Sequence, residues 1–509
     1  MPATAQVPAL ETQAGDTEGR SAERRVDLVR WVFLRCLGAV YLVVFASLWS
    51  QLHGLVGAGG ISPVSSTLEW AAQTHGQWGV WELPSLFWWA ADDAALSFAC
   101  VAGLSISVLL LTGVAPRAAL VCLWVLFLSI VQVGASFLAF QWDALLLEVG
   151  FAAIFLAPSQ LRPGLSRATP TPRIMVWVLR LTLFRLMFCS GYVKLASADP
   201  TWRNLTALEH HFQTQPLPTW IGWYVHQLPS AVLQLSAALM FMAELIVPFL
   251  IFGPRRARIV AFWVLAGFQT SLILTGNFAH FSALTLALCV LLLDDDALKA
   301  IVPPHLKPLT PPAGAEKRWR DGLVMGVAVA LIAMACLQTT VTLAGPKSLP
   351  GVARRGLAAL SQWHLVGRYG VFAVMTTQRL EIVIEGSSDG HGWRAYRFKH
   401  KAGQTRRPPS FVAPHQPRLD WQMWFASLRG HRHTPWFSSL IQRLLEGSPE
   451  VLDLFAENPF PEGAPVFVRA RLYEYRFSDL EERGRTGQWW LRQPRGMYFP
   501  AVSLPPEHP

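Results

Sequence analysis

The sequence predicts a polytopic α-helical membrane protein of about nine spans that ends in an α+β domain containing an antiparallel β-sheet. Three observations lead to this fold class. Residues 31–345 contain long apolar runs, the final third of the chain has an ordinary soluble composition, and basic residues gather in alternate loops. Charged residues make up only 15% of the 509 residues, whereas soluble domains usually contain about 25%.

The apolar runs have the length of membrane-spanning helices, which need about 20 mostly apolar residues and at least about 17. The fourth run is short for this purpose. The first run follows a polar stretch that lacks the pattern of a cleaved signal peptide, so we expect it to act as an uncleaved signal anchor. The predicted spans are 30–50, 94–113, 118–140, 143–157, 174–196, 230–252, 257–275, 277–293 and 322–345.

The loop charges predict the orientation, because Lys and Arg in short loops mark the cytoplasmic side. The loop from 51 to 93 contains no Lys or Arg. If 143–157 crosses the membrane, every basic loop lies on the side of the N-terminus, which is then cytoplasmic. The basic positions are Arg20, Arg24, Arg25, Arg30, Arg117, Arg162, Arg167, Arg173, Arg255, Arg256, Arg258, Lys299, Lys307, Lys317, Arg318 and Arg320.

Nine crossings divide the chain into a disordered cytoplasmic tail (1–29), a multi-span domain (30–345) and an α+β domain outside the cytoplasm (346–509). In this last domain, alternating or β-branched residues predict strands, and a Ser-Ser-Asp-Gly sequence predicts a turn between two of them. The expected strands are 380–385, 393–399 and 466–477, and the expected helices are 419–428 and 436–445.

The net charge of +10 does not indicate a nucleic-acid partner, because the early basic residues lie in the loops between apolar runs, where the bilayer and the cytoplasm explain them. All six cysteines fall inside or beside apolar runs, with no spacing typical of a zinc site. We therefore expect no metal, no cofactor and no disulfide framework.

Ionisable residues inside the spans are costly and count as candidate functional sites. Five lie within the predicted spans, namely Glu148, Arg180, Arg185, Lys194 and Glu244, and Asp143 lies at an outer rim. The helical rise places Arg185 near mid-membrane, within reach of either Glu148 or Glu244.

These charges have two interpretations. Buried ion pairs can fix the register of helices without binding anything. Alternatively, they line a polar cavity that opens outward, with Lys194 at its mouth. Lys194 would then act as a general base if desolvation lowers its pKa, or it would only extend to the membrane interface.

Four stretches combine uncommon residues in a long fixed order, and together they resemble the lipase maturation factor family. They are 33–63, with its Ser-Leu-Trp-Ser-Gln-Leu-His-Gly-Leu-Val-Gly sequence; 141–148, Gln-Trp-Asp-Ala-Leu-Leu-Leu-Glu; 190–218, which begins Ser-Gly-Tyr-Val-Lys-Leu; and 414–425, Pro-His-Gln-Pro-Arg-Leu-Asp-Trp-Gln-Met-Trp-Phe. The resemblance covers nearly all of the chain after residue 30.

The resemblance implies a non-enzymatic protein of the endoplasmic reticulum membrane that helps secreted lipases fold and assemble into active dimers. It implies a lumenal C-terminal domain and a lipase client. In a bacterium the same protein would lie in the plasma membrane. Asn204 begins an Asn-Leu-Thr sequon on the predicted outer side, which is either a glycosylation site or a packed turn at the membrane surface.

A weaker resemblance links the third stretch to vitamin K-dependent carboxylase and related multi-span proteins, through a Gly-x-x-Lys-Leu…Trp pattern. Only Lys194 carries over from that pattern. The alternative function is therefore a membrane enzyme or a binder of lipophilic ligands that uses Lys194.

The fourth stretch supplies candidates for client binding: His415, Arg418, Asp420, Trp421 and Trp424. Trp and Arg are common anchors of protein interfaces. The alternative is a structural knot that holds a helix to the sheet, in which Asp420 caps the helix or binds Arg418 with both oxygens.

Overall fold

The computed structural model describes residues 26–163, 170–299 and 318–505. Nearly all of the predicted tail 1–29 and much of the basic loop 294–321 lie outside these residues. In the described ranges, seven helices are long and apolar enough to cross a membrane. They are α1 (Asp27–Trp49), α5 (Asp93–Thr112), α6 (Pro116–Val133), α8 (Arg173–Ala196), α12 with its continuation (Ser230–Phe252), α13 (Arg255–Thr275) and α16 (Arg318–Ala344).

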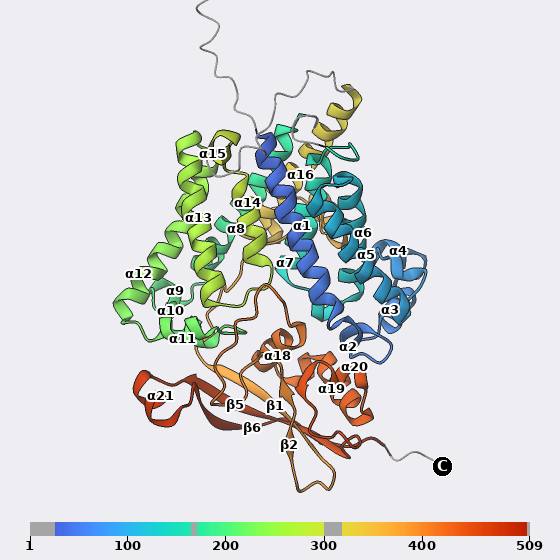
Figure 1. Cartoon of the computed structure of the whole chain (residues 1–509), viewed down its shortest axis with the longest axis vertical. Helices are drawn as coiled ribbons and strands as arrows, with labels where there is room; N and C mark the ends of the chain where they lie inside the picture. Colours follow the sequence, from blue (N-terminus) through green and yellow to red (C-terminus); the bar gives the residue numbers. More distant parts are fainter. Residues whose placement is uncertain (1–25, 164–169, 300–317, 506–509) are drawn as a thin grey trace, which may run out of the picture.

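The other two predicted spans form shorter helices of the same bundle, α7 (Gln141–Leu156) and α14 (Phe281–Val290) (Figure 1). At 1.5 Å per residue, the 16 residues of α7 extend about 24 Å. Asp143, near the start of α7, contacts the C-terminal domain, and the carbonyl of Ala157 just after its end accepts a hydrogen bond from Arg117 at the far end of the bundle. The helix therefore runs between the two ends of the bundle.

Small residues bring the helices α1 and α5 close together. A Cβ added at Gly38 would lie 2.8 Å from the backbone nitrogen of Leu111, and one at Gly103 would lie 2.3 Å from the ring of Phe45. Without a hydrophobic driving force between helices in lipid, such close backbone approach is a main source of helix association.

The C-terminal part of the chain forms a four-stranded antiparallel sheet in the order β2-β1-β5-β6. Strand β1 pairs with β5 from Arg379 opposite Tyr475 to Ser387 opposite Phe467. The strands are β1 (Arg379–Ser387), β2 (Arg394–Ala395), β5 (Phe467–Phe477) and β6 (Trp490–Val502), and β3 (Arg397–Phe398) pairs separately with β4 (Phe455–Glu457). The predictions of strands at 380–385 and 466–477 are confirmed, whereas 393–399 forms two short strands and β6 was not predicted.

Two helices, α18 (Arg418–Leu428) and α19 (Pro435–Glu446), lie between this sheet and the end of the bundle (Figure 1). Both were predicted. We call residues 379–505 the tail domain. One continuous cluster of buried apolar side chains joins it to the bundle, and Ile382 of β1 and Leu48 of α1 both belong to it.

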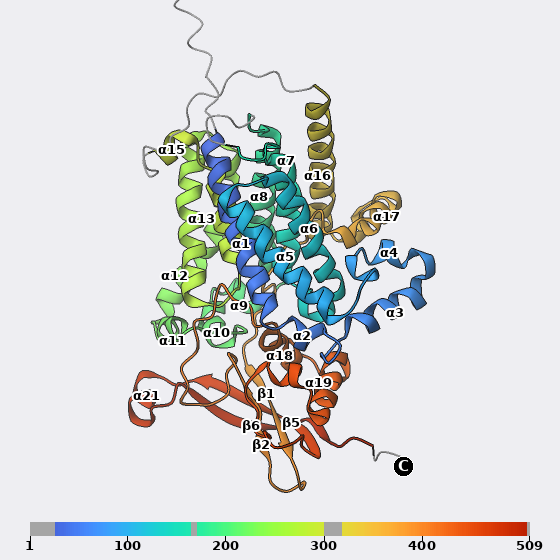
Figure 2. The same ribbon diagram turned by 45° about the vertical axis from the view of Figure 1, so that its right-hand side comes forward.

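Most of the short helices lie at the end of the bundle that carries the tail domain or within the tail domain, whereas α15 lies at the opposite end (Figure 1). Helices α3 and α4 project from one side beside α17, and the ring of Trp81 lies 5.3 Å from that of Trp363 (Figure 2). The remaining short helices are α2 (Leu52–Val56), α3 (Val64–His75), α4 (Gly79–Glu82), α9 (Pro200–Arg203), α10 (Ala207–Thr214), α11 (Trp220–His226), α15 (Asp295–Lys299), α17 (Gly351–Ala359), α20 (Pro449–Leu452) and α21 (Leu480–Thr486).

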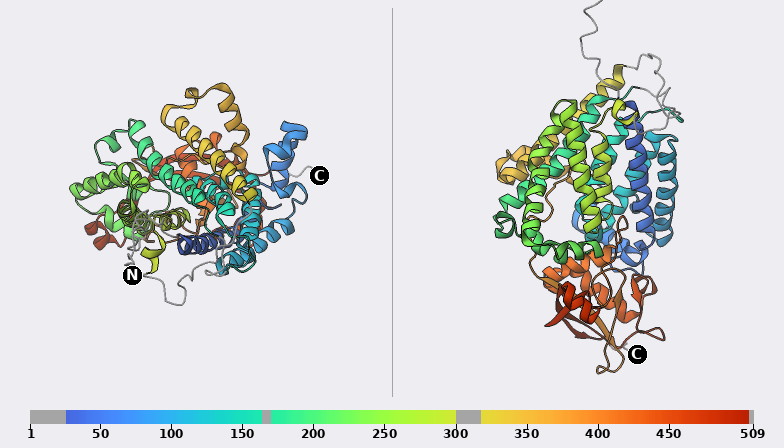
Figure 3. Two further views of the ribbon diagram at one scale, coloured as in Figure 1. Left: turned by 90° about the horizontal axis from the view of Figure 1, so that it is seen from above. Right: turned by 60° about the vertical axis from the view of Figure 1, so that its left-hand side comes forward.

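Seen along the bundle, α12 and α13 stand on the side opposite to α3 and α4 (Figure 3). Trp70, Trp78, Trp81 and Trp89, in the segment between α1 and α5, are exposed on the protein surface. Exposed tryptophans at one level of a helix bundle are typical of a membrane–water interface.

Candidate functional site

A buried ion pair joins the tail domain to the bundle. Both guanidinium Nη atoms of Arg418 in α18 donate to the carboxylate of Asp143 in α7, each at 2.8 Å. Nη1 of Arg418 also donates to the carbonyl of Phe137 at 2.8 Å. Arg418 is 1% exposed and Asp143 is fully buried. A planar guanidinium that binds both carboxylate oxygens fixes orientation as well as distance.

Side chains near the end of α1 and at the start of α7 complete this junction. Gln51 accepts a hydrogen bond from the backbone nitrogen of Arg418 and donates to the carbonyl of Gln416, both at 2.8 Å. The hydroxyl of Ser47 accepts from the backbone nitrogen of Gln416, and the indole of Trp142 donates to its side-chain oxygen. Three of the four stretches that suggested a family therefore meet at one place.

The remaining stretch, residues 190–218, contacts the segment that leads from α17 into β1. We call residues 363–378 the inserted segment. Asp199 accepts a hydrogen bond from the backbone nitrogen of Met375 at 2.6 Å, and Trp202 donates to the carbonyl of Phe372 at 2.9 Å. Arg379, the first residue of β1, donates to the carbonyls of Gln213, Gln215 and Pro216.

The inserted segment also reaches the charges inside the bundle. Glu148 accepts hydrogen bonds from Arg185 at 3.0 Å, from the backbone nitrogen of Gly367 at 2.5 Å and from the hydroxyl of Tyr369 at 2.6 Å. Arg185 donates to the carbonyl of Gly367 at 2.5 Å. The sequence allowed Arg185 to pair with Glu148 or with Glu244, and in the structure it pairs with Glu148.

Glu244 pairs instead with Lys194, whose Nζ lies 2.8 Å from both carboxylate oxygens. Glu244 belongs to a π-helical turn, Met242–Ile246, which continues α12 and precedes Pro248. A wider turn of this kind changes which side chains face a neighbouring helix, and it is frequent at functional sites. Lys194 is 3% exposed, so it does not extend to the membrane interface.

Arg180 donates through Nε to the carbonyl of Leu291 at 2.9 Å and stacks on the ring of Trp177. Together with the Arg185–Glu148 and Lys194–Glu244 pairs, it forms a set of buried contacts between helices. The six predicted intramembrane positions are all buried in the structure, and four of them form two of these ion pairs.

The predicted client-binding residues do not form an exposed surface. Arg418, Asp420, Trp421 and Trp424 are each less than 9% exposed, and His415 is half-buried. Since buried side chains cannot meet a client directly, this arrangement agrees with the structural knot and not with the recognition surface.

Asp420 does not bind Arg418. Its carboxylate accepts hydrogen bonds from the backbone nitrogens of His400 and Lys401, both at 2.8 Å. Burial raises the pKa of Asp420 above its usual range, and these two donors act in the opposite direction. Asp420 therefore ties the start of α18 to the loop that follows β3.

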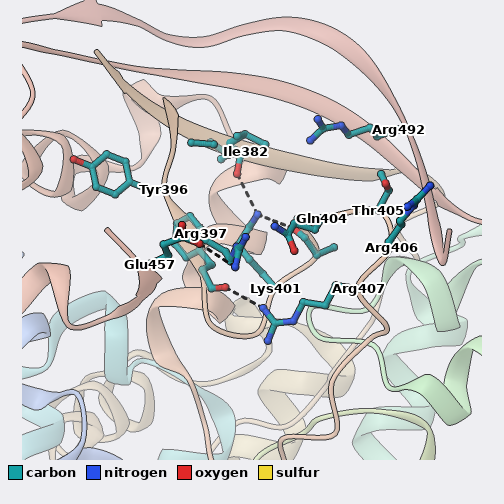
Figure 4. A pocket seen from close by; sticks show the side chains of 15 residues that line it. Ile382, Tyr396, Arg397, Lys401, Gln404, Thr405, Arg406, Arg407, Glu457 and Arg492 are labelled. Carbon is teal, nitrogen blue, oxygen red and sulfur yellow. Dashed lines mark hydrogen bonds and ion pairs between the residues drawn. The ribbon is translucent and has the colours of Figure 1, made fainter. Parts of the chain in front are cut away.

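The tail domain contains a recess of about 590 Å³ between the sheet and the loop 399–407. Figure 4 shows its basic side chains, which come from β3, from this loop and from β6. They are Arg397, Lys401, Arg406, Arg407 and Arg492. Lys401 pairs with Glu381 at 2.7 Å and Arg397 with Glu457 at 2.9 Å, whereas Arg406 and Arg492 are exposed.

Sequence reasoning missed this recess, because its basic residues between 397 and 407 match no motif, and Arg492 joins them only through the position of β6 in the sheet. A second cavity, of about 1180 Å³, lies between the bundle and α18. It reaches Lys194 and Glu244, and it is lined by Trp421 and Trp424. Asn204 is exposed near the tail-domain end of the bundle, and its glycosylation stays a prediction.

Comparisons with known proteins cover both parts of the chain. Residues 28–300 match the model of the lipase maturation factor transmembrane domain, and residues 365–500 match that of the lipase maturation factor C-terminal domain. No solved structure matches the chain.

Curated relatives share up to about a third of their residues with the chain. The chain is 36% identical to lipase maturation factor 2 of Rattus norvegicus, over 93% of this chain and 83% of the relative. It is 36% identical to lipase maturation factor 2 of Homo sapiens, over 94% and 83%. It is 32% identical to lipase maturation factor 1 of Homo sapiens, over 94% and 88%.

The Arg418–Asp143 pair should dominate the attachment of the tail domain. Substituting only Arg418→Met leaves a buried carboxylate without its partner, which should lower the free energy of unfolding by about 3–5 kcal/mol. The double variant R418M/D143L should lower the free energy of unfolding less than R418M alone, because it leaves no buried charge without a partner. Thermal unfolding in detergent measures both, with Arg476→Ala as control, since its exposed pair with Glu482 is worth about 0–1 kcal/mol. An equal loss of unfolding free energy in R418M and in Arg476→Ala would contradict the dominant role of the Arg418–Asp143 pair.

Acid should loosen the tail domain. Burial, followed by neighbouring cations, lowers the pKa of both His400 and His415 to about 4. Because the unfolded chain binds these protons near pH 6.5, the free energy of unfolding should fall as pH decreases from 7 to 5. The free energy of unfolding of the variant H400Q/H415Q should depend less on pH in this range. An equal free energy of unfolding at pH 7 and pH 5, measured by denaturant titration, would refute the prediction.

Proposed function

This chain belongs to the lipase maturation factor family, and we propose that it is a membrane-anchored maturation factor that assists the folding and assembly of secreted lipases. The observation that carries this proposal is the similarity over both the bundle and the tail domain, with curated relatives aligned over more than 80% of their own length. These relatives favour maturation over the carboxylase-like alternative. We propose that the protein acts by binding its client and without catalysis.

We further propose nine crossings, with α7 and α14 as the two short ones, and the tail domain outside the cytoplasm. The loops at the end of the bundle away from the tail domain carry the arginines beside α6, α8 and α13. In the loops at the other end, residues 51–92, 134–140, 197–229 and 276–280, Arg203 is the only Lys or Arg. This asymmetry supports the orientation through the positive-inside rule.

The same proposal divides the chain into three parts, namely the cytoplasmic tail 1–29, the multi-span domain 30–345 and the outer domain 346–509. It locates the protein in the endoplasmic reticulum membrane, or in the plasma membrane of a bacterium. Asn204 then faces the outer compartment.

A membrane-impermeant maleimide tests the orientation. Gly463 has open space around the position of a side chain, so Gly463→Cys in the tail domain should be accessible without disturbing the fold. In sealed, outside-out vesicles of a variant without native cysteines, Gly463→Cys should be labelled. Leu161→Cys, which replaces a 69%-exposed residue between α7 and α8, should be labelled only after permeabilisation. Labelling of Leu161→Cys in sealed vesicles would exclude the proposed topology.

We propose the recess of Figure 4 as the surface that meets the client. It presents the exposed Arg406 and Arg492 on one side, and the buried ring of Tyr396 lines the opposite side (Figure 4). Complementary charge speeds encounter and selects partners. An acidic segment of a partly folded lipase fits this chemistry, whereas the residues of the fourth stretch hold the recess in place through α18.

Charge reversal tests this role. The variant R406E/R492E should lower the activity of a co-expressed secreted lipase by at least several-fold, because it replaces attraction by repulsion at the recess. The abundance of the maturation factor should not change. The control is Arg485→Glu, which reverses an exposed charge on α21 of the same domain and should leave lipase activity intact.

Two results would contradict the proposal at different levels. Full lipase activity in R406E/R492E would exclude the recess as the client surface. Full lipase activity after complete deletion of the gene would exclude the maturation function itself.

A further inference from the structure

The cavity of about 1180 Å³ is a partly open chamber at the junction of three structural parts. Helices α12 and α13 of the bundle form one wall, the inserted segment forms another, and α18 of the tail domain forms the roof. Its lining is mainly apolar and aromatic, and includes Phe268, Leu272, Phe278, Phe372 and Phe425. Known ligand pockets of about 300–1,000 Å³ have this kind of lining, and the chamber is larger than that range.

The chamber opens sideways, between two membrane helices. Leu239 of α12 and Met242 of the following π-helical turn line the chamber and are 51% and 39% exposed. Gly267 and Ser271 of α13 also line it and are exposed. Because α12 and α13 are membrane-spanning helices, the surface around this opening faces lipid. An acyl chain from the bilayer can therefore enter without crossing water.

One polar group in the roof has no partner. The indole Nε1 of Trp421 is buried and has no hydrogen-bond acceptor among the described residues, although Trp421 lines the chamber. A buried donor without a partner costs about 1–3 kcal/mol. If the Trp421 ring turns toward the chamber, a ligand carbonyl oxygen that accepts from this indole removes that cost.

The charges in the wall compensate each other. Lys194 and Glu244 form a close ion pair, and burial, followed by the charge of Lys194, lowers the pKa of His211 to about 4, so this lining histidine is neutral at pH 7. Near this wall a ligand therefore meets apolar surface with no net charge, whereas Arg429, which also lines the chamber, is an exposed cation.

We propose that this chamber binds an ester-linked acyl lipid of the bilayer, which enters between α12 and α13 and whose ester carbonyl accepts a hydrogen bond from Nε1 of Trp421. The acyl chain lies against the aromatic lining, and the head group stays at the opening. The tryptophans of the fourth stretch thus face a lipid. This inference does not depend on the lipase client, because the binding site is complete within this chain.

Filling the mouth of the chamber tests the proposal. A Cβ at Gly267 would meet nothing within 4 Å, so the side chain of Gly267→Trp can begin in open space beside the chamber. The probe is phosphatidylcholine with a photoreactive diazirine in one acyl chain, in nanodiscs that contain the full chain. Labelling of peptides from the inserted segment and α18, which lie behind the mouth, should fall at least fivefold in G267W.

The matched control is Gly326→Trp. Gly326 also lies in a membrane helix, α16, with open space around its Cβ position, but it does not line the chamber. Labelling in G326W should equal that of the unaltered chain. Equal labelling in G267W and the unaltered chain, or labelling confined to outward-facing side chains, would overturn the proposal.

The ester carbonyl is tested separately. The unaltered chain should retain ester-linked phosphatidylcholine at least threefold better than its ether-linked analogue, which has no carbonyl. Trp421→Phe keeps an aromatic ring but removes the donor, so it should abolish this preference. No preference in the unaltered chain would exclude the hydrogen bond. If W421F does not fold, the ester-to-ether ratio of the unaltered chain still decides this point. Lipase secretion is not part of either measurement, so failure here is distinguishable from failure of the maturation function.

Discussion

The structure depends on one buried ion pair, between Arg418 of the tail domain and Asp143 of the bundle. Removing two charges from water costs several kcal/mol for each ion, and close pairing with further hydrogen bonds must offset this cost. Here both Nη atoms of Arg418 bind the carboxylate, and the carbonyl of Phe137 takes a further bond. Few alternative positions of α18 would satisfy these groups, so the pair specifies how the tail domain sits on the bundle.

Fixing α18 has consequences on both of its sides. Toward the bundle, its tryptophans close the chamber that opens between α12 and α13. Toward the sheet, Asp420 holds the backbone of His400 and Lys401, at the start of the loop that borders the basic recess. A lipid-facing chamber and a water-facing recess thus share one supporting helix. A change in one site therefore has a short structural path to the other.

The sequence predicted the elements better than their partners. Apolar runs identify the helices because each must be as long as the membrane is thick, and the depth of Arg185 allowed its pairing with Glu148. The Lys194–Glu244 pair was missed for two reasons. Lys194 lies two residues before the end of α8 at Ala196, whereas Glu244 lies well inside the next span, and the π-helical turn at Glu244 changes which side chains face α8. Strand β6 was missed, because Pro494 and Gly496 interrupt its pattern and its pairing with β5 contains register shifts. The fourth stretch was recognised, but its burial was not predicted. Arg418 of this stretch is buried against Asp143, 275 residues away in the chain, and no local sequence pattern indicates such a distant contact.

The central claim is that the bundle and the tail domain form one cooperative unit through this junction. Amide hydrogen exchange of the full chain in nanodiscs tests it most directly, by following β1, β5 and α7 in the unaltered chain and in Arg418→Gln. Cooperative units exchange together, so the substitution should lower protection in the strands and in the first turns of α7 to a similar extent. Full protection of β1 and β5 in R418Q, with loss confined to α18, would contradict the claim.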